Sequence, residues 1–371
     1  MKKVKLGEVT INIDNRRKPL NNLQRSEKSF SKKYPYCGAN NIIDFIDEYI
    51  FDENEEILCI AEDGGNWGKD EECTYVMNEK CWVNNHAHVL KMKTGVDINY
   101  IKLILDYLDL TPYITGSTRG KLTKSSLDKI EINLPNYHTQ ISISKKISDI
   151  QKLITKKEEQ IQKYNELVKS RFNEMFGDIF DNPQSKLEDH TELNPNKREE
   201  LLNFNGDVSF IPMANVSENG KINLSINRNI DDVRKGFTFF KDNDVIVAKI
   251  TPCFENGKGA PLFGLLNGIG FGSTEFHVLR PKNTVNTVWL YHVTMLSEFR
   301  LEGERKMTGS GGQRRIPKDF ISNFKLNIPP LSLQNEFADF VAQVDKSQLA
   351  IQKSLEELET LKKSLMQEYF G

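Results

Sequence analysis

Residues 135–177 read PNYHTQISISKKISDIQKLITKKEEQIQKYNELVKSRFNEMFG, and residues 329–371 read PPLSLQNEFADFVAQVDKSQLAIQKSLEELETLKKSLMQEYFG. The two stretches align without a gap at an offset of 194 residues, share a glutamine at Gln140 and Gln334, and both end on Phe-Gly. A repeat marks a recurring structural unit, so it constrains the architecture more strongly than any local pattern does. The sequence therefore predicts one plan that is used twice.

Each repeated stretch predicts a long helix. Neither contains a Pro or Gly from about residue 139 to 176 or from 333 to 370, and proline just before each is a start signal. Apolar residues recur at steps of three and four, which is the spacing of a coiled-coil seam. At 1.5 Å per residue each helix spans about 55 Å and needs a partner to bury that seam. The alternative is that each helix packs on its own domain. We expect seam contacts from Ile143, Ile147, Ile150, Ile161, Phe337, Val341, Val344, Leu355 and Leu358.

The repeat continues more loosely before each helix. Thr115-Gly116-Ser117 recurs as Thr308-Gly309-Ser310, and His88-Val89-Leu90-Lys91 recurs as His277-Val278-Leu279-Arg280. Each half therefore has a variable front part and a more faithful tail.

The front parts predict compact α+β domains. Short β-rich runs at 56–61 and 244–248 are bounded by turn residues, and helical stretches follow near 98–108 and 286–300. The linker between the halves is expected at Asp178 to Asn182. We expect domains at residues 1–134 and 179–328, and spacer helices at 135–178 and 329–371.

Composition is that of a folded protein, with 38% hydrophobic and 27% charged residues in 371. No signal-peptide run and no apolar stretch of membrane-spanning length occurs, so we expect a cytoplasmic protein without membrane contact. The five cysteines are odd in number and form no C-x-x-C pair, which favours free, buried thiols.

The net charge of −2 counts against a nucleic-acid binder, whose binding domains are often strongly basic. The distribution of charge is more informative. Residues 1–33 are rich in Lys and Arg, whereas residues 44–72 are rich in acids and hold one basic residue, Lys69. Such segregation is typical of a one-sided binding face, and the alternative is that both runs are solvated surface.

No catalytic constellation is recognisable. The glycine-rich turn and Asn/Asp-Pro-Pro-aromatic loop of a methyltransferase are missing, and so is a P-loop. His86 and His88 with Cys81 suggest a zinc site, but two histidines on one strand face and a distant cysteine do not complete a tetrahedral set. We therefore expect no catalytic residue, no metal and no cofactor held by this chain.

Two matching loops, 115–121 and 308–315, offer groups that bind a phosphate backbone. Small residues allow close approach, backbone amides donate hydrogen bonds, and Lys and Arg neutralise charge. A plain surface turn is the alternative for either loop alone. The phosphate-binding candidates are Arg119, Lys121, Lys124, Arg314, Arg315 and Lys318.

Reading base edges needs side chains with paired donors and acceptors, and both halves supply them. The stretch Asn84-Asn85-His86 aligns with Ser273-Thr274-Glu275, and the chemistry differs between the two. Asp63-Gly-Gly-Asn66-Trp67 lies nearby in the first half. Two different readers on one scaffold would give this pattern, and so would drift at unimportant positions. The base-reading candidates are Asn84, Asn85, His86, Lys249, Asn256, Lys258, Thr274 and Glu275.

The order variable domain, long helix, variable domain, long helix resembles the DNA-specificity subunits of type I restriction-modification systems, over essentially the whole chain. Several strings look typical of that family: Ile250-Thr-Pro-Cys-Phe-Glu-Asn-Gly-Lys258, Phe271-Gly-Ser-Thr-Glu-Phe276, both Thr-Gly-Ser loops, and Ile328-Pro-Pro-Leu-Ser-Leu-Gln334.

The resemblance implies a non-catalytic subunit with two target-recognition domains, each reading one half of a split site in double-stranded DNA. It implies that the two helices pair antiparallel as a spacer. It also implies that two adenine methyltransferase subunits dock on the chain, that restriction subunits join them, and that S-adenosylmethionine belongs to the methyltransferase. The alternative is a coiled-coil scaffold that binds only protein, but such a scaffold would not need two unlike, loop-rich domains at equivalent places.

Overall fold

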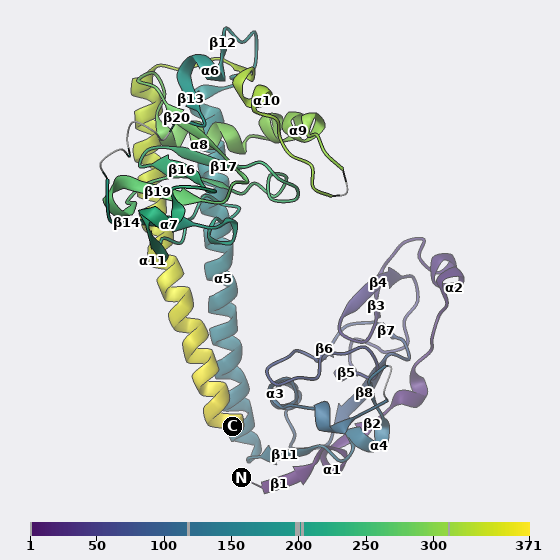
Figure 1. The fold of residues 1–371 in the computed structure, drawn as a ribbon. Helices are drawn as coiled ribbons and strands as arrows, with labels where there is room; N and C mark the ends of the chain where they lie inside the picture. Colours follow the sequence, from purple (N-terminus) through teal and green to yellow (C-terminus); the bar gives the residue numbers. More distant parts are fainter. Residues whose placement is uncertain (1, 117–118, 197–200, 202–203, 311) are drawn as a thin grey trace. The chain divides into compact units, whose positions relative to one another are not determined.

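Two 40-residue helices dominate the computed structural model, which describes residues 2–116, 119–196, 201, 204–310 and 312–371 (Figure 1). They are α5 (Tyr137–Phe176) and α11 (Leu331–Phe370). The chain divides into two compact units, so that each unit contains part of both helices. Unit 1 comprises residues 1–159 and 352–371, and unit 2 comprises residues 160–351.

Unit 1 is built on two small sheets. The strand order β2-β8-β5-β6 is antiparallel throughout, and in the order β4-β3-β7 the last pair is parallel. The strands are β1 (Lys2–Lys5), β2 (Thr10–Asn12), β3 (Tyr34–Cys37), β4 (Ile42–Ile46), β5 (Ile57–Ala61), β6 (Thr74–Met77), β7 (Trp82–Val83), β8 (Ala87–Met92), β9 (Ile114–Thr115), β10 (Lys121–Leu122) and β11 (Glu131–Leu134). The short helices are α1 (Leu6–Val9), η1 (Asp14–Arg16), α2 (Asn22–Glu27), α3 (Ile98–Tyr107), η2 (Thr111–Tyr113) and α4 (Lys124–Leu127).

Unit 2 repeats the two sheets of unit 1, and its second sheet has one strand more. The order β13-β20-β17-β18 corresponds to β2-β8-β5-β6, and β15-β14-β19-β16 again contains one parallel pair, β14 with β19. The strands are β12 (Ser185–Lys186), β13 (Thr191–Leu193), β14 (Asp207–Ile211), β15 (Asn227–Asn229), β16 (Thr238–Lys241), β17 (Val245–Ala248), β18 (Gly259–Pro261), β19 (Ile269–Gly272), β20 (Phe276–Pro281) and β21 (Lys325–Leu326). The short helices are α6 (Leu187–His190), η3 (Met213–Asn215), α7 (Ile230–Val233), η4 (Leu266–Gly268), α8 (Thr287–Met295), α9 (Ser297–Lys306) and α10 (Lys318–Ser322).

The repeated glutamines explain how each long helix is attached to its own domain. The Gln140 side chain accepts a hydrogen bond from the Asp97 backbone N–H, just before α3, at 2.9 Å. The Gln334 side chain accepts the same bond from Asn286, just before α8, at 2.8 Å. Both glutamines are fully buried. Because buried amides need partners, the repeat keeps a glutamine at this position.

The two helices pair antiparallel in each unit, as the resemblance implied. In unit 1 the Lys362 ammonium donates to Gln151, and in unit 2 the Gln348 amide donates to Asn165 at 2.8 Å. Residue numbers rise along one helix as they fall along the other. The predicted α+β class with two long paired helices is therefore confirmed.

The seam residues fall into two groups. Ile143 and Ile147 join the core of unit 1, which also holds Phe370, and Phe337, Val341 and Val344 join the core of unit 2. The start of each helix thus packs on its own domain and on the end of the other helix. The seam between the helices and the packing of each helix on its own domain therefore both occur. Leu355 is also buried, whereas Ile150, Ile161 and Leu358 are half-buried.

Other expectations have simple outcomes. The helical stretch near 286–300 is two helices, α8 and α9, divided at Leu296. All five cysteines are free, and four of them are buried. Among the residues that the structure describes, no helix is long and apolar enough to cross a membrane.

Candidate nucleic-acid interface

A turn just before β8, residues 84–86, forms what we call the tip of unit 1. The Glu62 N–H donates to the His86 carbonyl and the Leu122 N–H donates to the Glu62 carbonyl, both at 2.8 Å. The tip, the end of β5 and the segment after the 115–121 loop are therefore held together by backbone hydrogen bonds. We call these three segments the frame.

Unit 2 has the same frame, with its tip at residues 273–275. The Lys249 N–H donates to the Glu275 carbonyl, and the Ile316 N–H donates to the Lys249 carbonyl, again both at 2.8 Å. In each tip the first residue accepts a hydrogen bond from the backbone N–H of the third, from His86 to Asn84 at 2.8 Å and from Glu275 to Ser273 at 3.2 Å. Equivalent backbone hydrogen bonds thus present different side chains in the two units.

A buried histidine supports each frame, because its ring contacts a backbone carbonyl of the segment after the loop. In unit 2 the His277 Nε2 atom donates to the Ile316 carbonyl, and Nδ1 faces the Asn194 amide at 3.1 Å. Burial lowers the pKa of His277, so the neutral ring fits this site. The Asn194 side chain also accepts from the Val278 backbone N–H.

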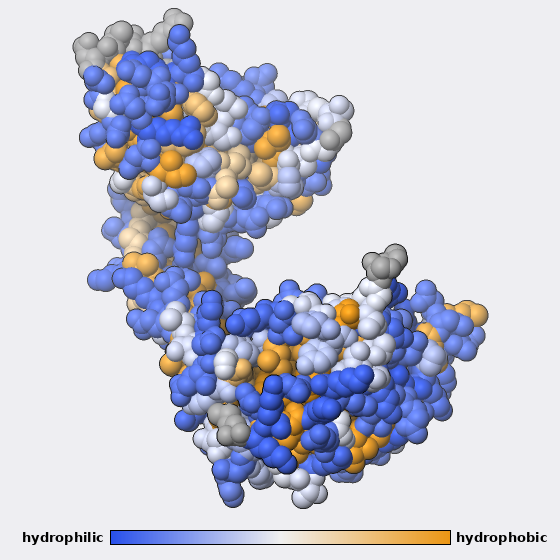
Figure 2. All heavy atoms as spheres, turned by 60° about the horizontal axis from the view of Figure 1, so that its bottom comes forward, coloured by the Kyte–Doolittle hydropathy of each residue, from blue (hydrophilic) through white to orange (hydrophobic). Residues whose placement is uncertain are grey.

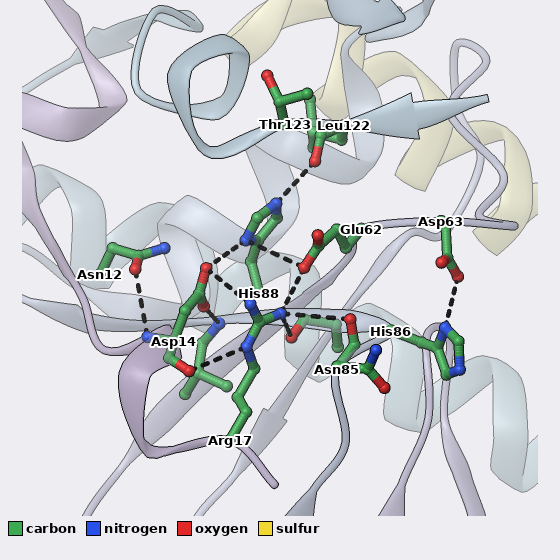
Figure 3. A network of polar contacts seen from close by, with 12 residues as sticks. Asn12, Asp14, Arg17, Glu62, Asp63, Asn85, His86, His88, Leu122 and Thr123 are labelled. Atoms are coloured by element: carbon green, nitrogen blue, oxygen red, sulfur yellow. Dashed lines mark hydrogen bonds and ion pairs between the residues drawn. The ribbon is translucent and has the colours of Figure 1, made fainter. Parts of the chain in front are cut away.

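The corresponding site of unit 1 is ionic (Figure 3). His88 Nε2 lies 2.7 Å from the Leu122 carbonyl and Nδ1 lies 2.6 Å from Asp14 Oδ2. Both ring nitrogens of His88 therefore face acceptor oxygens. Asp14 takes the place of Asn194 and accepts from the Val89 backbone N–H at 2.8 Å.

Arg17 completes this ionic cluster. Its guanidinium donates to Glu62 at 2.5 Å and to the Ala87 carbonyl at 2.7 Å, and it lies 3.3 Å from Asp14. Burial alone would raise the pKa of Glu62, but Lys121 and Arg17 lower it below its usual range. Among the described residues, Asp14, Glu62 and His88 are the one group with metal-ligand spacing. Because Arg17 contacts both carboxylates and Lys121 pairs with Glu62, we assign the cluster a supporting role.

The loop cations expected to meet phosphate lie at the frame, and in unit 1 they are paired with acids. Arg119 lies 3.2 Å from Asp63, and Lys121 lies 2.8 Å from Glu62. Both cations remain largely exposed, at 69% and 50% of their side chains. Ser117 and Thr118 of this loop lie outside the described residues.

Unit 2 shows the same pairing with other acids. Arg315 makes two hydrogen bonds to Glu275, at 2.9 and 3.0 Å, and Arg314 lies 3.6 Å from Glu255. The hydrogen bonds from Arg315 lower the pKa of the Glu275 carboxyl. Arg315 was predicted to contact phosphate and Glu275 to read a base, and the structure brings these two side chains together.

Two further cations, Lys124 and Lys318, lie in the first turns of α4 and α10. Both are exposed, and in the described part of the chain they make no ion pair. Figure 2 shows that the face drawn there is mostly hydrophilic, with exposed apolar side chains in small, scattered groups.

The base-reading candidates are not equally placed. Asn85 and Thr274 are exposed at the centre of each tip, and His86 is half-buried, with Nδ1 2.8 Å from Asp63. Asn84 is a correction: its side chain is 3% exposed and caps the turn, so it does not reach outward.

In unit 2 the remaining candidates lie close in sequence at the end of β17. Asn256 is exposed in the turn after β17, and Lys249 and Lys258 are half-buried. The Lys258 carbonyl accepts from the Ala248 N–H, which fixes that turn against β17.

The segregated charge runs pair with each other. Arg16 bonds Glu55, Arg25 lies 3.3 Å from Asp44, and Lys28 bonds Glu48. The interpretation of these runs as a one-sided binding face was therefore wrong for these residues. Arg17 and Asp14 were missed as site residues, although the complementary runs were a signal that Arg17 would find an acidic partner such as Glu62.

Two α+β domains with equivalent frames and paired long helices define a tandem-repeat protein whose halves share a scaffold and differ in the side chains they present. The chain belongs to the type I restriction modification DNA specificity domain family, whose model matches residues 1–163 and again residues 182–361.

Curated relatives carry the same description. The chain is 42% identical over 146 residues to the type I restriction enzyme EcoAI specificity subunit of Escherichia coli, and 38% identical over 138 residues to the EcoEI specificity subunit. These matches cover 38% and 36% of this chain but only 24% and 23% of those relatives. A putative type I restriction enzyme specificity subunit of Haemophilus influenzae is 24% identical over 354 residues, which cover 91% of this chain and 85% of that protein.

Solved structures share the fold. A type I restriction-modification S subunit from M. genitalium matches with a TM-score of 0.61 at 13% identity, over 100% of this chain and 96% of that one. A chain from a structure that addresses assembly and conformational transition of the type I R-M system matches with a TM-score of 0.53 at 13% identity, over 100% and 97% of the two chains. At this identity the likeness shows the fold alone.

Proposed function

We propose that this chain is the DNA-recognition subunit of a type I restriction-modification complex. The observation that carries the proposal is the frame, which occurs in both units with the same backbone hydrogen bonds and with different side chains at the tips. A protein that reads two unlike half-sites needs one scaffold and two sets of contacts. Membership of the specificity-domain family supports the same role.

The proposal assigns parts to the contacts. Lys124 and Lys318, together with the loop cations, would contact phosphates, while Asn85 and His86 in one unit and Thr274 and Glu275 in the other would face base edges. Asn and Glu suit this task, since an amide can pair with adenine and a carboxylate can accept from the cytosine amino group. Lys249, Asn256 and Lys258 would border the second reading site.

The proposal also assigns chemistry to partners. The chain would be non-catalytic and would place two adenine methyltransferase subunits, and restriction subunits with them, on a bipartite gapped site in the cytoplasm. S-adenosylmethionine would be held by the methyltransferase. The relatives named as specificity subunits of type I restriction enzymes support this division of labour.

A selection experiment tests the proposal. The full chain, purified together with its methyltransferase partner, is incubated with a library of random duplexes, and the bound molecules are sequenced over several rounds. We expect enrichment of two short fixed elements separated by a fixed gap. Enrichment of no sequence by a complex shown to be assembled would contradict the proposal and favour a scaffold that binds only protein.

A further inference from the structure

All four loop cations of the two frames are neutralised by a carboxylate from another segment. The pairs are Arg119 with Asp63, Lys121 with Glu62, Arg314 with Glu255 and Arg315 with Glu275. The loops expected to bind phosphate therefore present little free positive charge.

The acids come from positions that do not correspond between the units. The frame hydrogen bonds place Glu62 at the position of Lys249 and His86 at that of Glu275. The acid that pairs with Lys121 thus follows β5 in unit 1, whereas the acid that pairs with Arg315 lies on the tip in unit 2. The cation–carboxylate pairing occurs in both units, but the acid stands at a different position in each. Inheritance of one acid from a common repeat therefore does not explain the pairing.

The pairs are fixed well enough to compete with a phosphate. Asp63 is 19% exposed and also accepts from His86, and Glu275 is 25% exposed and holds Arg315 by two hydrogen bonds. The two charge-assisted hydrogen bonds of the Arg315–Glu275 pair are among the stronger kinds of polar contact in proteins, whereas the Arg119–Asp63 pair has one contact at 3.2 Å. A phosphate must displace such a carboxylate before it can take the cation.

Resting on the proposed function, we infer that Asp63 and Glu275 are specificity-determining residues that mask the loop cations against DNA of the wrong sequence. Lys124 and Lys318 make the first phosphate contacts in any sequence. At the correct site, exocyclic amino groups of the bases give the displaced carboxylate new partners, and the arginine moves to phosphate. At a wrong site the carboxylate would stay beside the DNA phosphates without a hydrogen-bond donor, and this unpaired negative charge would oppose binding.

Binding to random duplex tests this inference without knowledge of the target. The full chain and the variants Asp63→Asn and Glu275→Gln are titrated with random-sequence duplex across a NaCl series. Each variant should bind about threefold or more tightly at low salt, with a salt slope steeper by about one phosphate contact. Glu79→Gln and Asp232→Asn, exposed acids on the β6–β7 turn and on α7, are controls with the same change in net charge.

Two more variants separate masking from other effects. Asp63→Glu keeps the charge and should bind like the parent chain, and adding Arg119→Gln to Asp63→Asn should remove the gain. A gain that survives Arg119→Gln, or equals that of the controls, overturns the inference. If Asp63→Asn and Glu275→Gln bind duplex with the same affinity as the parent chain, the inference is overturned but the proposed function stands. If neither the parent chain nor any variant binds duplex, both are rejected.

Discussion

The two buried histidines show how one residue changes the character of a frame. His277 sits against a neutral amide, Asn194, while His88 sits against a carboxylate, Asp14, that Arg17 also contacts. Asp14 accepts from the backbone N–H of the residue after His88 at 2.8 Å, and Asn194 accepts from that of the residue after His277 at 2.9 Å. The hydrogen-bond geometry is thus kept while one site is neutral and the other ionic.

This comparison gives a prediction for Asp14. Asp14→Ala leaves Arg17 and His88 without their shared carboxylate and should destabilise unit 1 by about 2–4 kcal/mol. Asp14→Asn restores the acceptor found in unit 2 and should cost clearly less. Urea unfolding followed by circular dichroism and by tryptophan fluorescence measures both losses; Trp67 and Trp82 report on unit 1, and Trp289 reports on unit 2. Equal losses for the two variants would contradict the assigned role.

Stability should fall in mild acid because of His292. Burial beside the Phe172 and Phe337 rings lowers the pKa of His292 to about 4. The unfolded chain binds a proton at this ring below about pH 6.5, whereas the folded unit binds it only below about pH 4, so protons favour unfolding between these values. At pH 5 the loss should be about 1–2 kcal/mol relative to pH 7.

The matched variant is His292→Phe, which keeps an aromatic ring in the same packing. Thermal unfolding at pH 7 and pH 5, followed by circular dichroism, should show a smaller acid shift in this variant than in the parent chain. The same shift in both proteins would assign the acid sensitivity to other groups, such as His277.

At the scale of elements, the bounds of the long helices could be predicted from local sequence patterns. The contacts that build the domains join residues far apart in the sequence and could not. Helix bounds, the attachment glutamines and the seam spacing follow from local pattern and repeat, so α5 and α11 fall where the sequence predicts. The pairing of Arg315 with Glu275, or of Arg17 with Glu62, spans 40 or more residues. No spacing rule relates such positions, because the chain between them sets which side chains meet.

The helix seam predicts a graded response to charge. Val344 is 5% exposed whereas Ile150 is half-buried, so Val344→Asp should destabilise by about 3–5 kcal/mol and Ile150→Asp by clearly less. Circular dichroism during thermal unfolding measures the helical transition in both variants. Similar midpoints for the two would mean that the seam is no more tightly closed at Val344 than at Ile150.

A polar pair that joins the two helices, a buried Gln348 and an exposed Asn165, gives a second prediction for the helices. The buried Gln348 amide donates to Asn165 across the helix pair. Asn165→Leu should cost about 1–3 kcal/mol because it leaves that amide unsatisfied, while Asn165→Leu with Gln348→Leu should recover most of the loss. A double-mutant cycle by denaturant unfolding measures the coupling, and additive losses would mean that the pair contributes nothing of its own.

At the scale of the whole molecule, the net charge of −2 agrees with the masked loops. A chain that presented all its loop cations would bind any DNA and would depend on salt for release. With four of those cations paired, the proposed masking predicts a low affinity for DNA in general and a larger share of the selectivity for the reading contacts. The sequence indicated which loops matter, but the partners of their cations became visible only in the folded units.

The most direct test of the recognition role is methylation mapping. Long-read sequencing compares cells that express this chain with its methyltransferase partner against cells that express the methyltransferase alone. We predict that methylated adenines appear in a split, gapped sequence only when this chain is present. An active methyltransferase that gains no new methylated sequence from this chain would contradict the account.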